Sequence, residues 1–169
     1  DDDQLLAIDA AYKINERWKL KAEVANSDTD VKANAWIAEA EYRKGKLQGR
    51  LYANQQDDGF GLGQQSGVSE GERKIGATAN YKLSDDETFI LNASKLLNLD
   101  TDDTRVRASA EWQKSVNDNK FIVGLSHVDE MADGQSEQAQ RLKVGASKTL
   151  NGGRLALATS LEKKLNDSE

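Results

Sequence analysis

The chain has 169 residues, enough for one domain, and we expect residues 1–169 to form a single one. Its 23 basic and 29 acidic residues give a formal net charge of −6, which argues against nucleic-acid binding by bulk charge. Cys is absent, so disulfides and thiolate metal sites are excluded, and the absence of Pro suits uninterrupted strands. No stretch approaches the ~18 apolar residues of a transmembrane helix, a test that does not detect membrane-spanning strands.

Alternating apolar and polar residues predict two hairpins in the first third of the chain. The first joins residues 5–14 to 18–26 through a turn at 15–17, and the second joins 35–43 to 46–55 through Lys44 and Gly45. A polar link, 27–34, connects them. Residues 56–71 then form the longest non-periodic stretch, rich in Gly, Gln and Asp.

Three more hairpins follow this stretch. The predicted strand pairs are 73–83 with 88–96, 105–113 with a strand that begins at Phe121, and 140–150 with 154–164. Links at 97–103 and 129–136 connect them, and Asn151-Gly152-Gly153 is a strong hairpin signal within the last pair. Because no segment shows helical spacing, we predict an all-β, antiparallel up-and-down meander of about ten strands.

The stretch 105–113 shows the two-faced character of these strands. Val106, Ala108, Ala110 and Trp112 alternate with charged or polar residues, as expected for a strand whose faces differ. An open meander leaves two long edges, and closure into a β-barrel removes them. We therefore expect a closed barrel.

The two ends of this barrel are expected to differ. One rim carries the tight turns and the other carries the longer, mostly acidic links, an asymmetry typical of outer-membrane barrels. Seven aromatic residues on the apolar face lie beside tight turns and predict an aromatic belt at the lipid headgroups, with Trp36 as an exception near the other rim: Tyr12, Trp18, Tyr42, Tyr81, Phe89, Trp112 and Phe121.

The opposite face carries charges of both signs. If it points into a barrel of about ten strands, these side chains can pair across a plugged or narrow lumen. The predicted charged-face residues are Lys19, Lys21, Glu23, Glu39, Glu41, Arg43, Arg50, Arg105, Arg107, Glu111, Arg154 and Glu162.

A second interpretation reverses the two faces. The apolar face is rich in Ala and the mean hydropathy is −0.74, so the chain could also be a soluble β-barrel or β-sheet module with its charges in water. Such a module would bind an apolar ligand or a partner protein.

Parts of the sequence resemble a known class of membrane protein. Residues 35–65, which include Gly59-Phe60-Gly61-Leu62-Gly63-Gln64-Gln65, together with 73–77 and 81–85, are similar to the β-barrel region of large proteobacterial outer-membrane surface proteins, of the OmpA-like and TonB-receptor-like kind. The resemblance covers most of the chain and implies an outer-membrane location and an anchoring role. Such barrels usually end on an aromatic residue, whereas this chain ends at Glu169 and starts without Met, so we expect a fragment of a longer protein.

The inventory of reactive residues does not support catalysis. His127 is the one histidine and has no Cys or second His for a zinc site or triad. Gly59, Gly61 and Gly63 resemble a phosphate loop, but no helix follows and the lysine is missing. Five aspartates are weak candidates for Ca²⁺, without EF-hand spacing, and are better explained as turn residues: Asp28, Asp30, Asp100, Asp102 and Asp103.

These observations define the expected function. We predict a non-catalytic structural barrel without cofactors that anchors a surface protein in the bacterial outer membrane. Its partners would be outer-membrane lipid and other domains of the parent protein, with no nucleic acid. The alternative locations are the periplasm and the cell surface.

Overall fold

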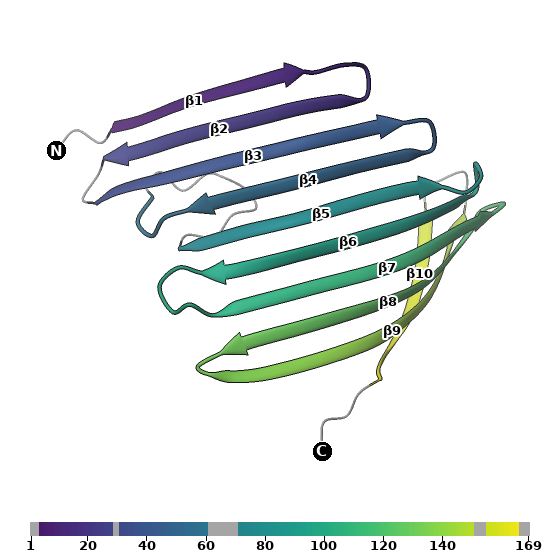
Figure 1. The fold of residues 1–169 in the computed structure, drawn as a ribbon. Coiled ribbons are helices and arrows are strands. Elements are labelled where there is room, and N and C mark those ends of the chain that lie inside the picture. Colours follow the sequence, from purple (N-terminus) through teal and green to yellow (C-terminus); the bar gives the residue numbers. More distant parts are fainter. Residues whose placement is uncertain (1–3, 29–30, 61–70, 151–154, 166–169) are drawn as a thin grey trace.

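The structure is a computed structural model that describes residues 4–28, 31–60, 71–150 and 155–165. These residues form one sheet of ten antiparallel strands (Figure 1). The strands are β1 (Gln4–Lys13), β2 (Trp18–Asp28), β3 (Lys32–Lys44), β4 (Leu47–Gln56), β5 (Glu72–Lys82), β6 (Glu87–Asn98), β7 (Thr104–Val116), β8 (Asn119–Ala132), β9 (Gln135–Leu150) and β10 (Leu155–Lys164).

Each strand pairs with its neighbour in sequence, in the order β1 to β10. The predicted all-β antiparallel meander is thereby confirmed. Within the described residues no helix is long and apolar enough to cross a membrane. The Asn-Gly-Gly hairpin signal at 151–153 lies outside the described residues.

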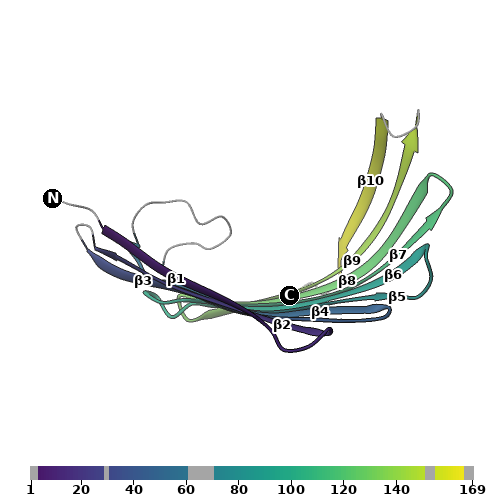
Figure 2. The ribbon, with the colours of Figure 1, turned by 90° about the horizontal axis from the view of Figure 1, so that it is seen from above.

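The sheet is open and bent into a trough (Figure 2). β1 and β10 form its two edges and do not pair with each other, so the structure does not show the closed barrel expected from the sequence. Because β1 and β10 are the first and last of an even number of strands, they run antiparallel.

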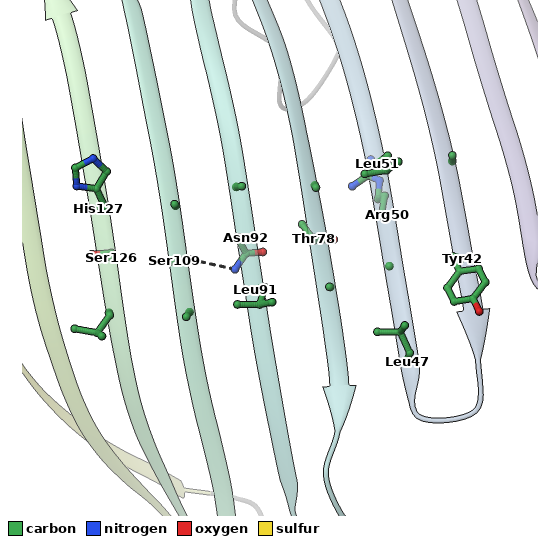
Figure 3. Close-up of a pocket in the computed structure, with 18 of the residues that line it drawn as sticks. Tyr42, Leu47, Arg50, Leu51, Thr78, Leu91, Asn92, Ser109, Ser126 and His127 are labelled. Atoms are coloured by element: carbon green, nitrogen blue, oxygen red, sulfur yellow. Dashed lines mark hydrogen bonds between the residues drawn. The ribbon is translucent and has the colours of Figure 1, made fainter.

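The two faces of the trough differ in chemistry. The register aligns alternate residues of neighbouring strands, such as Tyr81, Phe89 and Trp112, on one face, which we call the apolar face. Figures 1 and 3 view the sheet from its convex side, and in Figure 3 Leu51 lies in front of the ribbon and Arg50 behind it. The apolar face is therefore convex. The opposite, concave side is the charged face.

The hydrogen-bond register is staggered from strand to strand. Tyr12, beside the turn after β1, leads through direct partners to Ala77 and Ala93 in the middle of β5 and β6. The same row continues to Gln140, whose carbonyl accepts a hydrogen bond from Leu165 beyond the far end of β10. A drift of about one residue per strand, at about 3.4 Å per residue and 4.8 Å between strands, corresponds to a strand tilt of roughly 35°. Barrel strands are tilted by a similar angle.

The strands extend further than the sequence indicated. The predicted link 129–136 is β-strand except for a two-residue turn at Asp133 and Gly134, both with positive φ. Likewise, β2 continues to Asp28, so most of the link 27–34 is also strand. The alternation fades there because polar residues occur on both faces. We call the end of the sheet with the tight turns the turn rim and the opposite end the loop rim. The loop rim thus has one long connection, 57–71. The two rims therefore differ less in the length of their connections than the sequence predicted.

The sheet has almost no apolar core. Buried apolar residues in the described chain are Phe60 and four alanines, and three of these, Ala25, Ala33 and Ala35, pack with Phe60 on the charged face near the loop rim. The chain exposes 12076 Å², whereas a compact globular protein of its mass would expose roughly 8,200 Å². A single curved layer leaves the apolar face uncovered.

Tyr52 and Gly76 form a close contact on the charged face. A Cβ on Gly76 would lie 2.4 Å from the Tyr52 hydroxyl and 2.9 Å from the Ala93 carbonyl oxygen, so the tyrosine ring occupies the space that a side chain would need. The Arg50 guanidinium lies 5.2 Å above the same ring. The φ of Gly76 is not in the left-handed region, so backbone conformation does not require a glycine here. Packing against Tyr52 does.

We predict that Gly76→Ala destabilises the sheet by roughly 1–3 kcal/mol, because the added methyl group overpacks this contact. Urea unfolding followed by tryptophan fluorescence measures the change. The matched control is Gly49→Ala, where the nearest atom to a new Cβ lies at 3.6 Å and little change is expected. Equal effects of the two substitutions would contradict the packing role of Gly76.

Candidate functional site

The seven predicted belt residues share the apolar face, near the turn rim. Tyr81 is the direct cross-strand partner of Phe89, and Phe89 is the partner of Trp112. Trp18 and Tyr42 are also direct partners, with ring centroids 4.8 Å apart. The seven aromatic side chains therefore lie in a staggered band along the turn rim, which we call the aromatic belt.

A shallow depression lies on the apolar face beside the belt (Figure 3). Its volume is about 810 Å³, and its floor consists of alanines and Gly49, with larger side chains such as Tyr42, Leu51 and Leu125 around them. His127 lies at the edge of this depression, and its Nδ1 atom is buried without a hydrogen-bond partner. The depression offers apolar contact and no charged group on its own face.

Ion pairs link β2, β3 and β4 across the charged face. Lys21 lies 2.6 Å from Glu41 and 3.7 Å from Glu39, and Arg50 pairs with Glu39 from the other side. The Glu39 side chain is 13% exposed. These four residues, which we call the β2–β4 ion network, were all predicted to share the charged face.

A second group of pairs spans β7 to β9. Arg105 pairs with Glu130. Lys143 Nζ lies 3.4 Å from Glu111, across Gly124, which is the direct partner of both residues on the intervening strand. The absence of a side chain on Gly124 leaves room for this contact.

Other predicted residues are placed separately. Glu162 pairs with Arg141 at 3.4 Å. Lys19, Glu23 and Arg43 lie on the charged face by register, and Arg107 lies there without an ion pair or hydrogen bond within the described chain. Arg154 lies outside the described residues.

The predicted aspartates serve as turn and rim residues. Asp28 pairs with Lys32 at 3.1 Å, and Asp103 accepts hydrogen bonds from the Thr101 hydroxyl and the Asp133 amide. Asp102 has a positive φ of 59° in the same connection as Asp100. The described residues contain no group of three or more His, Asp or Glu that could hold a metal. Asp30 lies outside them.

Three ion-pair partners of the predicted charged-face residues were missed in the sequence: Glu130, Arg141 and Lys143. Glu130 fell within the stretch 129–136, which was interpreted as a link. If the alternation is extended through β8 and β9, it places all three residues on the charged face. No protein-family model matches the sequence, and no curated protein matches it. The function must therefore be inferred from the two faces of the sheet.

We predict that Glu39→Gln lowers the free energy of unfolding by about 1 kcal/mol. The substitution removes the carboxylate that pairs with Arg50, and the Glu39 side chain that carries it is nearly enclosed. The matched control is Glu162→Gln, which removes a carboxylate whose side chain is 53% exposed and should cost less. Urea unfolding at low and high salt measures both, and salt should shrink the difference. If the two substitutions lower the free energy of unfolding equally, the proposed contribution of the β2–β4 ion network to stability is contradicted.

Proposed function

We propose that this chain forms the wall of a non-catalytic outer-membrane β-barrel, with the apolar face against lipid and the charged face toward the lumen. In this role it anchors a surface protein. The proposal rests on one observation above all: the sheet curves around its charged face and leaves large apolar side chains on the convex side.

This curvature favours the membrane over a soluble barrel. In a soluble barrel the apolar side chains line the concave interior. Here Leu6, Ile8 and Leu161 are 68%, 70% and 74% exposed, while the Lys21–Glu39 and Arg105–Glu130 pairs lie on the charged face. An uncovered apolar surface of this extent marks an interface with a partner or membrane.

Strand length and pattern agree with a membrane span. A transmembrane strand needs about 9–11 residues, and the strands here have between 10 and 16. On β7 the outward residues from Val106 to Trp112 give an uncharged length of about 20 Å. This is short for a bilayer, so Arg73 and Lys95, the next outward residues on β5 and β6, would extend their charged ends toward the headgroups.

The edges require partners in this environment. Unpaired backbone groups in hydrocarbon cost several kcal/mol each. We propose that β1 and β10 pair with each other in the membrane, since they run antiparallel and the register already has the stagger of a barrel.

We predict that tryptophan at position 112 contacts lipid tails and that tryptophan at 113 does not. The test uses two single-tryptophan proteins in which Trp18 and Trp36 are replaced by Phe: one keeps Trp112, and the other carries Trp112→Gln with Gln113→Trp. The two positions are adjacent on β7 and their side chains lie on opposite faces. Fluorescence is measured in vesicles of phospholipid brominated on its acyl chains.

Quenching at position 112 alone supports the proposed orientation. Quenching at 113 alone would reverse the two faces. Quenching at neither position, with the protein recovered free of vesicles, would refute the membrane proposal and favour a soluble module that binds an apolar ligand or partner.

We predict that a disulfide forms between Cys at positions 7 and 160 in the vesicle-inserted chain. Ala7 and Ser160 are small, lie on the charged face, and stand at similar distances from the turn rim on the two edge strands. The chain has no native Cys, so mass spectrometry after oxidation reads the link directly. The control pair is Ala7→Cys with Ser147→Cys, which closure does not bring together.

An intramolecular link in the first pair only supports ten-strand closure. Links only between copies would show that a second copy supplies the edge. No link in a chain that passes the quenching test would refute β1–β10 pairing while leaving the lipid-facing orientation intact.

A further inference from the structure

A second cavity, of about 530 Å³, lies on the charged face over β4 to β9. Three arginines and one carboxylate contribute its charged lining: Arg105, Arg107, Arg141 and Glu130. We call it the arginine pocket. In a chain whose net charge is −6, this local excess of positive charge favours a negatively charged occupant.

The three guanidinium groups differ in how fully they are used. Arg105 pairs with Glu130, but its Nε atom is buried and has no hydrogen-bond acceptor. Arg141 forms an ion pair with Glu162, a residue that does not line the pocket. Arg107 is exposed and forms no ion pair or hydrogen bond within the described chain. The pocket therefore retains donors that its one carboxylate, Glu130, does not satisfy.

Neutral donors surround these arginines. Ser94 is the direct partner of Arg107, and Ser126 is the direct partner of Arg141. The Ser109 oxygen accepts a hydrogen bond from Asn92 at 3.3 Å, so its own hydroxyl hydrogen is free to donate. Hydroxyl groups beside guanidinium groups suit an anion with several oxygen atoms, and they offer little to an apolar molecule.

We propose that the arginine pocket binds the oxyanion group of a small solute, of the phosphate, sulfate or carboxylate class. Arg107 supplies the free guanidinium, whose planar fork matches two oxygens of such a group. Glu130 competes with the anion for Arg105. The inference goes beyond the anchoring role and concerns the face opposite the lipid contact, so either proposal can fail alone.

The test measures inorganic phosphate binding to the full chain in zwitterionic detergent micelles. Phosphate is titrated in place of chloride so that the ionic strength stays constant. Binding is followed through the arginine Nε–Hε resonances in nuclear magnetic resonance. Arg107→Gln should weaken binding by about tenfold, the loss of one charge-assisted contact. The matched control, Lys95→Gln, removes a positive charge from the apolar face and should change binding less than about twofold.

Glu130→Gln provides the opposite test. Removing the competing carboxylate frees Arg105, so phosphate should bind several-fold more tightly, an outcome that general damage to the fold would not produce. Circular dichroism confirms that each variant keeps its β-structure.

Three results would overturn the proposal. They are the absence of a saturable phosphate effect in the native chain, equal weakening by Arg107→Gln and Lys95→Gln, and weaker binding in Glu130→Gln.

Discussion

Backbone hydrogen bonding between successive strands is the interaction on which this molecule depends. Apolar burial contributes little, since Phe60 and a few alanines are the buried apolar residues of the described chain. The ladder also fixes which side chains meet, because a shift by one residue would exchange the two faces of a strand. The ion pairs around Glu39 and the aromatic belt both follow from that register.

Much of this architecture could be predicted from the sequence. The period-2 alternation identified the strands, and it placed Trp112 and Glu111 on opposite faces. The ends of β8 and β9 were missed because apolar and polar residues no longer alternate regularly there, so Glu130 could be placed only by extending the alternation of the strand interior. The direction of curvature could not be predicted, since an alternating strand reads the same whether its apolar side is convex or concave.

The pairings on the charged face were also beyond the sequence. They depend on cross-strand register, which sets Gly124 between Glu111 and Lys143 and lets the two charges meet. The contact between Tyr52 and Gly76 has the same origin. Alternation assigns a residue to a face, and register then decides its neighbours.

The strict pairing of neighbours in sequence has a consequence for how such a sheet can evolve and assemble. Because each strand contacts only the strands before and after it, duplication of one hairpin adds two strands without disturbing any existing contact. The edges stay antiparallel and the two faces keep their identity after each addition. Assembly can follow the same rule, since each hairpin forms from local contacts and extends an existing edge. The width of such a sheet is therefore a variable that gene duplication can change in steps of one hairpin.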